Sequence, residues 1–217
     1  MTEAILVAAL LGGVFGFVAD RLSACWPVHE DGSVRSLDWR TVAVVLGGGA
    51  AFGLLAARWT DPLDLLVLGL YVAALIVLLA TDLDQKLLPD LITFPLMGYA
   101  LVVLVLGLNP VLAGKTQVLI ADGDLAAVMA AIAAPALLAV TDRVFRGALG
   151  MGDLKLAVSL GLMFGITQLF AGFLVGTIGF AVVVLALVLS RRVSMKTAVP
   201  FGPALIAAGV MAAVIQL

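Results

Sequence analysis

Residues 141–155 read TDRVFRGALGMGDLK and join one apolar run of the chain to the next. Within this stretch, Gly150-Met151-Gly152-Asp153 sets an acidic residue among glycines just where the sequence becomes hydrophobic again. Glycine permits tight turns and the close approach of other groups to the backbone. Carboxylates near membrane depth are rare and usually functional, so Asp153 is a candidate site residue. Taken alone, the stretch supports a plain helix-capping or first-turn acid equally well.

The composition places the chain in a lipid bilayer. Hydrophobic residues make up 64% of the sequence and charged residues 12%, and the mean hydropathy is +1.24. Soluble domains average about 25% charged residues. The apolar residues come in blocks of about 15 to 22, which favours membrane-spanning helices over the alternating strands of a barrel. We therefore expect an all-α membrane protein with a single integral-membrane domain over residues 1–217.

The scarce residue types exclude other classes. A net charge of -2 provides no basic surface for nucleic acid. The single cysteine, Cys25, allows neither an internal disulfide nor a cysteine-rich metal site.

The apolar blocks predict a polytopic helical bundle of about eight transmembrane spans, within a range of six to eight. The blocks cover residues 4–19, 41–57, 65–80, 92–108, 125–141, 154–169, 171–190 and 199–217. Only Gln168 and Gly172 mark the break between the sixth and seventh blocks. No small-residue cleavage site follows the first block, so we expect a retained span rather than a signal peptide. The small residues at 48–51 predict close packing of the second span against a neighbouring helix.

The distribution of basic residues orients the spans, because lysine and arginine gather in the cytoplasmic loops of membrane proteins. Placing the loop 21–40 in the cytoplasm gives that side ten of the twelve basic residues. The ten are Arg21, Arg35, Arg40, Lys86, Arg143, Arg146, Lys155, Arg191, Arg192 and Lys196, and the other two are Arg58 and Lys115. This asymmetry predicts both termini outside, and the loops 82–91, 142–153 and 191–198 on the cytoplasmic face.

A second acidic segment lies on the same predicted face. Residues 81–90 read TDLDQKLLPD and begin where the third apolar block ends, so Asp82 lies at the foot of a helix. An acid at a helix C-terminus is disfavoured by the helix dipole, typically by about 0.3–1 kcal/mol, and therefore calls for a reason. A solvated loop accounts for Asp84 and Asp90 better than it accounts for Asp82.

A pair of carboxyl groups has a characteristic chemistry. Two carboxylates within a few ångström of each other do not both ionise cheaply, so one holds a proton while the other stays charged. Such a pair can activate water for attack on a peptide carbonyl and protonate the leaving amine, with no metal and no covalent intermediate. Asp82 and Asp153 are the candidate pair.

These segments resemble the type IV prepilin peptidases, which together with the archaeal preflagellin peptidases are GxGD-type intramembrane aspartyl proteases. The resemblance covers most of the chain from residue 65 onward. It rests on Asp82 with Leu87-Leu88-Pro89-Asp90, on Gly150-Met151-Gly152-Asp153-Leu154-Lys155 and on Pro200-Phe201-Gly202-Pro203, in the family's order. Residues 12–22 are similar, more loosely, to the end of the family's first span.

The resemblance implies that Asp82 and Asp153 are the catalytic pair. It implies motif or substrate-positioning places, without a transferred catalytic role, for Gly150, Gly152, Lys155, Asp84, Asp90, Pro89, Pro200, Gly202 and Pro203. Residues 65–217 would form the catalytic spans, and residues 1–64 the N-terminal spans with a short cytoplasmic loop.

The activity implied by the resemblance is removal of the leader peptide from pilin, pseudopilin or Tad-type precursors at the cytoplasmic face of the inner membrane. No metal or cofactor is implied. The expected partners are prepilin-like membrane proteins and the lipid bilayer, with no nucleic acid, and the oligomeric state is left open.

One departure from the family concerns the first cytoplasmic loop. Many bacterial members carry a large insert there, with two CxxC pairs that bind zinc, and also N-methylate the cleaved product. Here the loop has about twenty residues with Cys25 alone, so cysteines cannot build a zinc site. The sequence leaves N-methylation open.

Three other classes remain as alternatives. A small transporter or channel also contains intramembrane acids, but its sites usually lie near the bilayer midplane. A structural membrane subunit leaves the combination of motifs unexplained. A presenilin-like protease shares the GxGD motif, but its first catalytic acid would not lie in an LLPD segment. Within the protease interpretation, Gly147, Gly150 and Gly152 make their loop the candidate hinge.

Overall fold

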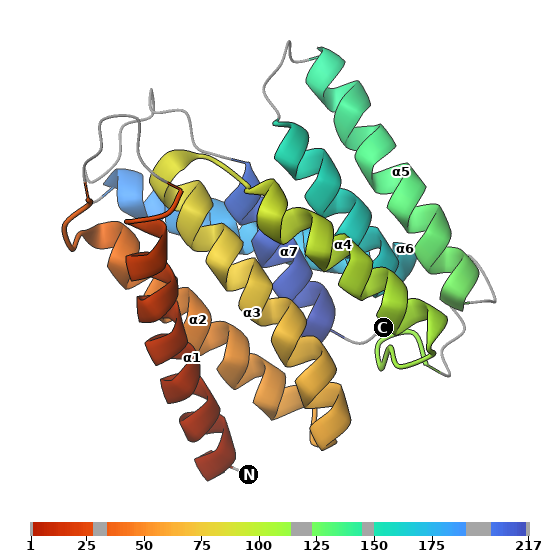
Figure 1. Ribbon diagram of the computed structural model, residues 1–217, viewed down its shortest axis with the longest axis horizontal. Coiled ribbons are helices and arrows are strands. Elements are labelled where there is room, and N and C mark those ends of the chain that lie inside the picture. The colour runs from red at the N-terminus through yellow and green to blue at the C-terminus, as the bar shows by residue number, and fades with distance from the viewer. Residues whose placement is uncertain (1, 28–33, 114–122, 145–149, 190–200, 216–217) are drawn as a thin grey trace.

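The computed structural model of the protein describes residues 2–27, 34–113, 123–144, 150–189 and 201–215, and within these ranges every regular element is a helix (Figure 1). The helices are α1 (Thr2–Ser23), α2 (Trp39–Arg58), α3 (Pro62–Gln85), α4 (Asp90–Val105), α5 (Gly123–Val144), α6 (Met151–Leu189) and α7 (Gly202–Val214). The prediction of an all-α protein is confirmed. Pro200 and Gly147 lie outside the described residues.

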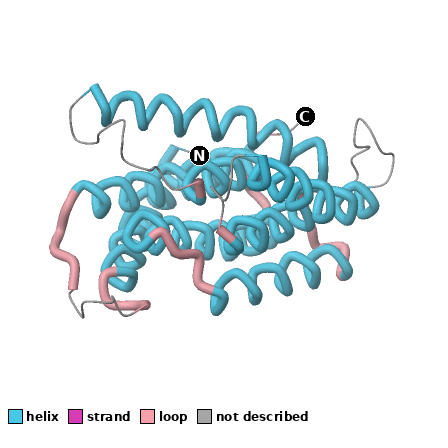
Figure 2. Tube along the Cα trace, turned by 90° about the horizontal axis from the view of Figure 1, so that it is seen from above, coloured by secondary structure: helices cyan, strands magenta, loops and turns pink. Residues whose placement is uncertain are grey.

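Five of these helices, α1, α2, α3, α5 and α6, are long and apolar enough to cross a membrane. The helices α4 and α7 are apolar but shorter, with 16 and 13 residues. The fold is therefore a multi-pass membrane bundle, as predicted, although helix length alone does not confirm eight spans. Figure 2 shows the connections between helices at the two ends of the bundle.

The helix α6 is bent at Gly165. Its 39 residues would extend about 58 Å if straight, roughly twice the thickness of the hydrocarbon core. Gly165 has φ 67° and ψ 179°, a non-helical conformation that glycine adopts at low cost. The parts before and after this residue run in different directions (Figure 1). The predicted break at Gln168 and Gly172 was wrong in position, because both residues lie within the helix after the bend.

A buried asparagine supports the bend. Asn109, in the connection after α4, is 3% exposed. Its Nδ2 donates a 2.8 Å hydrogen bond to the carbonyl of Met163, and its Oδ1 accepts one from the N–H of Val111. A bend interrupts the hydrogen-bond ladder of a helix. Asn109 therefore satisfies a carbonyl two residues before the interruption and ties the α4–α5 connection to it.

The core is organised around α3, which packs against α1, α2, α4 and α7. Tyr71, in the middle of α3, is fully buried, and its hydroxyl shares a 2.9 Å hydrogen bond with the hydroxyl of Ser159 on α6. The rings of Tyr99 and Phe164 both pack against the ring of Tyr71, at centroid distances of 6.5 Å and 5.6 Å. These contacts fix α3 against α4 and α6, so the end of α3 has a defined position in the bundle.

Helices approach one another most closely at glycines. A Cβ atom added at Gly48 of α2 would lie 2.4 Å from the carbonyl oxygen of Gly12 on α1, and one added at Gly161 of α6 would lie 2.4 Å from the backbone N of Ala131 on α5. Small residues drive helix association in membranes because they let backbones come into contact. The predicted close packing at residues 48–51 is confirmed at Gly48.

A pair of neighbouring glycines tests this packing. We expect Gly48→Ala to destabilise the protein by about 1–3 kcal/mol, because the added methyl group meets backbone that cannot move away. We expect Gly47→Ala to be neutral or stabilising, because its Cβ would meet only the Cδ2 of Leu79 at 3.4 Å and alanine favours helix. Thermal unfolding in detergent measures both, and equal melting temperatures would contradict the packing.

Candidate active site

Asp82 lies in the last turn of α3. The helix continues five residues beyond the predicted span and ends at Gln85, where Lys86 takes a left-handed conformation and its N–H donates a 2.9 Å hydrogen bond to the carbonyl of Asp82. The side chain of Asp82 is buried, with 4% of the residue exposed. The acid thus occupies the negative end of the helix dipole, where a carboxylate is disfavoured.

Asp153 lies in the first turn of α6 and is 7% exposed. Its Oδ2 accepts a 3.0 Å hydrogen bond from the N–H of Gly150, and its own N–H donates to the carbonyl of Gly150 at 3.1 Å. This reciprocal pairing resembles half of a capping box, in which the third helical residue closes back on the residue before the helix. The first-turn interpretation of Asp153 is therefore correct, and the same contacts hold the carboxyl group in a fixed orientation.

Two glycines bring the chain segments of the site into contact. A Cβ at Gly152 would lie 2.7 Å from the Cβ of Leu88, in the segment that follows α3. A Cβ at Gly202, at the start of α7, would lie 2.6 Å from Oδ2 of Asp82. The ends of α3, α6 and α7 thus converge, and each predicted acid lies at or directly beside one of these contacts.

The carboxyl group of Asp82 is the least satisfied polar group of the site. Its Oδ2 is buried and has no hydrogen-bond partner among the described residues. Leaving such an atom unpaired costs about 1–3 kcal/mol, and more when the group is charged. Buried polar atoms in native proteins almost always have a partner. This oxygen is therefore the acceptor of the site that the described protein groups leave available.

Asp84 differs from its prediction as a solvated loop residue. It lies within α3, its side chain is 1% exposed, and its Oδ1 forms ion pairs with Arg35 at 2.7 Å and Arg40 at 3.2 Å. An acid two residues from Asp82 points to the other side of the helix, away from the site. The solvated interpretation was wrong because Arg35, which precedes α2, and Arg40, in the first turn of α2, reach this end of α3.

The other motif residues lie at the same end of the bundle. Asp90 and Lys155 form a 2.5 Å ion pair between α4 and α6, and the ammonium group of Lys155 lies 4.6 Å from the ring centre of Phe94. Asp90 is exposed, as predicted. Pro89 precedes the first residue of α4, and Pro203 lies in the first turn of α7, positions where a missing N–H costs nothing.

Sequence reasoning missed a buried ionic cluster beside the site, made of Asp20, Arg35, Asp38, Arg40 and Asp84. Asp20, near the end of α1, is completely buried and pairs with Arg21 and Arg35. Burial by itself would lower the pKa of Arg35, but its hydrogen bond with Asp20 and the neighbouring carboxylates raise that pKa above its ordinary value. Asp20 follows directly after the first apolar block, and this position was the signal that could have identified it. The same signal had already identified Asp82.

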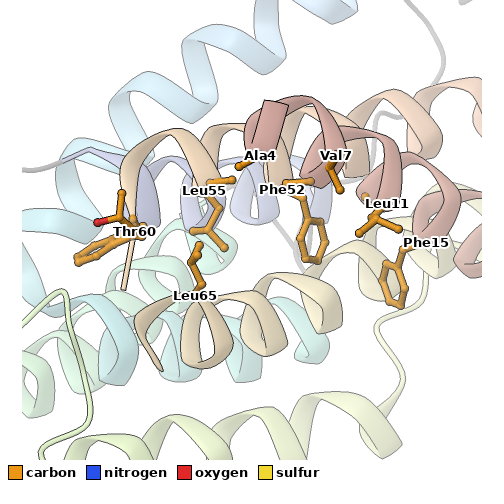
Figure 3. A pocket seen from close by; sticks show the side chains of 12 residues that line it. Ala4, Val7, Leu11, Phe15, Phe52, Leu55, Thr60 and Leu65 are labelled. Carbon is orange, nitrogen blue, oxygen red and sulfur yellow. The ribbon is translucent and has the colours of Figure 1, made fainter. Parts of the chain in front are cut away.

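A groove of about 730 Å³ lies elsewhere, between α1, α2 and α3 (Figure 3). Its lining is apolar apart from Thr60, with Phe15, Phe52 and Leu65 pointing into it. Leu65 is at the beginning of α3, about 25 Å along the helix from Asp82. The groove is therefore separate from the aspartates and contains no acid of its own.

The fold and the site together define a multi-pass helical membrane protein with two buried aspartates where three helix ends meet. The model of the type IV leader peptidase family matches residues 69–215, more than half of the chain, and the chain belongs to this family. The predicted resemblance is thereby confirmed.

A curated relative is the "Prepilin leader peptidase/N-methyltransferase" of Bacillus subtilis (strain 168), which is 27% identical over 161 residues. The match covers 74% of this chain and 60% of the relative. No solved structure matches the chain.

A crosslinking experiment tests whether the two aspartates share one site. In a Cys25→Ser background, which removes the exposed native thiol, we expect Asp82→Cys with Asp153→Cys to be joined by a short bifunctional thiol reagent. Asp64→Cys with Asp153→Cys is the control, because Asp64 lies about 27 Å from Asp82 along α3. Mass spectrometry of the linked peptides measures both pairs. Equal linkage of the two pairs, or none in either, would contradict the arrangement.

Proposed function

We propose that the protein is an intramembrane aspartyl endopeptidase that removes the leader peptide of prepilin-like membrane proteins, whether pilins, pseudopilins or Tad-type precursors. The observation that carries this proposal is that two buried aspartates, on α3 and α6, lie at converging helix ends beside glycines that leave no room for a side chain. Membership of the type IV leader peptidase family supports it, as does the printed name of the Bacillus subtilis relative.

The reaction needs only water and the two carboxyl groups. One carboxyl group is ionised and takes a proton from a water molecule as the water oxygen attacks the peptide carbonyl. The other carries a proton and delivers it to the leaving amine when the C–N bond breaks. The products are a new carboxyl end on the leader and a new amino end on the mature helix. Oδ2 of Asp82 is available for this chemistry because no described residue binds it.

The position of the site favours a substrate that crosses the membrane boundary. Both aspartates lie within one turn of a helix end, and the distribution of basic residues predicts that this end faces the cytoplasm of the inner membrane. The scissile bond then lies where a basic leader gives way to an apolar helix. Asp90 pairs with Lys155, but its side chain is 59% exposed, so it can exchange this partner for the leader's basic residues, an effect that salt weakens. Asp84 cannot, because arginines already hold it.

A transport function fits the site less well. Transporters bind their substrates near the bilayer midplane on interrupted helices. The described interruption, at Gly165, lies twelve residues beyond Asp153, about 18 Å along the helix. The proposal is limited to peptidase activity, and methylation of the product forms no part of it.

Substitution of the aspartates tests the proposal. We expect Asp82→Asn and Asp153→Asn each to reduce cleavage of a prepilin by about 10²–10⁴-fold, because an amide neither takes nor delivers the catalytic proton. Asp64→Asn, at the other end of α3, should leave the rate unchanged. The rate of appearance of the shortened product from purified enzyme and precursor measures the effect. Full activity of either of the first two variants would refute the assignment.

A second test uses two glycines of α7. We expect Gly202→Ala to lower kcat at least tenfold, because its methyl group would displace the carboxyl group of Asp82, and a displacement of about 1 Å can cost 10²-fold. In Gly209→Ala the added group would meet the Cδ2 of Leu160 at 2.6 Å and the Cδ1 of Leu75 at 3.0 Å, both ends of flexible side chains. Gly209→Ala should therefore retain most activity. Comparable losses in both variants would show a general packing defect instead.

A further inference from the structure

The end of α3 that carries Asp82 is capped through its backbone, because the N–H of Lys86 donates to the carbonyl of Asp82, but its last turn has an unfavourable charge. Its last turn contains two acids, Asp82 and Asp84, and no basic residue. Both acids oppose the helix dipole. The turn is followed by Lys86, a non-glycine residue in the left-handed conformation, which costs about 1–2 kcal/mol. The charge and the backbone conformation therefore both weaken the turn that carries Asp82.

Groups from the connection between α1 and α2 and from the first turn of α2 contact this turn. Arg35 lies with its Nε 2.7 Å from Oδ1 of Asp84, as an ion pair rather than an aligned hydrogen bond. Arg40 donates through Nη1 to Oδ1 of Asp84 at 3.2 Å and to the carbonyl of Asp84 at 3.5 Å. Gln85 donates through Nε2 to the carbonyl of Pro27 at 2.6 Å. The arginines thus place positive charge against an acid at the negative end of the helix.

Arg35, one of the two arginines that contact α3, is itself held by groups at the ends of α1 and α2. Arg35 is 11% exposed and pairs with Asp20 of α1, which is fully buried. Asp20 also accepts a 2.8 Å hydrogen bond from the hydroxyl of Thr41 in the first turn of α2. Buried ion pairs with several hydrogen bonds have fixed geometry, and removing one partner is costly. The chain of contacts therefore runs from α1 and α2 to the last turn of α3.

Asp82 and Asp84 project from opposite sides of this turn, since residues two apart on a helix do not face each other. Asp84 is held on the side of α1 and α2, and Asp82 faces Gly202 on the side of α7. We propose that Arg35 and Asp84, secured by Asp20, are positioning residues that hold the last turn of α3 so that the carboxyl group of Asp82 stays in the catalytic site. This inference rests on the proposed peptidase function.

The positioning residues come partly from outside the region that defines the family. The family model matches residues 69–215, so Asp20 and Arg35 precede it. Neither residue touches the aspartate pair; both act through α3. The first two helices and their connection therefore complete the active site of this chain.

Two aspartates of the ionic cluster form a matched pair for the test. Asp38 and Asp84 each form ion pairs with both Arg35 and Arg40, but only Asp84 belongs to α3. Asp84→Asn and Asp38→Asn thus remove the same charge from the same two arginines. Asparagine also preserves the N-cap of α2 at position 38.

We expect Asp84→Asn and Arg35→Ala to lower kcat for prepilin cleavage by about 10–100-fold with KM within about threefold of the wild type, the range expected for a displacement of about 1 Å. The double variant should lose no more than the worse single variant. Asp38→Asn should stay within about threefold in kcat. Hydrogen–deuterium exchange of peptides covering residues 81–88 should be faster in the first two variants and unchanged in Asp38→Asn.

The two readouts separate the inference from the function on which it rests. Equal exchange at residues 81–88 in wild type and Asp84→Asn, or equal losses of activity in Asp84→Asn and Asp38→Asn, would overturn the positioning role. Faster exchange with unchanged kcat would overturn it as well. If wild-type protein cleaves no prepilin, the proposed function fails, and the exchange experiment alone then decides whether the cluster holds the turn.

Discussion

The burial of carboxyl groups at one end of a hydrophobic bundle is the constraint on which the rest of this structure depends. An ionised carboxylate that leaves water loses several kcal/mol unless it is paired. Asp20 and Asp84 meet the constraint through arginines. Asp153 accepts a backbone N–H, and Oδ2 of Asp82 has no hydrogen-bond partner among the described residues. The acids that lack an arginine are the ones available for chemistry.

Glycine meets a second constraint, which is that apolar helices gain little by associating within apolar lipid. Their association depends on close packing, and small residues permit it. Gly12 and Gly48 bring α1 and α2 together in this way, and Gly152 and Gly202 do the same where chain segments converge on the aspartates. At the site the glycines admit side chains, those of Leu88 and Asp82, whereas within the bundle Gly48 admits the backbone of a neighbouring helix. The geometry of the site therefore depends on helix packing and on the segment that follows α3.

The sequence predicted the parts of the structure that depend on local pattern. Apolar blocks located the helices, and an acid at the end of a block or beside glycines located Asp82 and Asp153. The burial of Asp84 could not be predicted, because it depends on Arg35, which is distant in the sequence and reaches α3 only in the folded bundle. The bend at Gly165 was misplaced for a similar reason. Several glycines suit a break, and tertiary contacts such as that of Asn109 with Met163 select one of them.

The position of the aspartates near helix ends fits the proposed reaction, which needs water and also an apolar environment for the substrate helix. Hydrolysis requires water and charged groups, which the hydrocarbon core excludes, while an apolar substrate helix gains by staying in that core. Only the end of a span satisfies both needs. Asp82 lies in the last turn of α3 and Asp153 in the first turn of α6, and the ionic cluster that balances the charge of Asp84 lies at the same end. The apolar groove near Leu65 lies toward the other end of α3 and contains no acid. The acids and the apolar groove are thus separated along the length of α3.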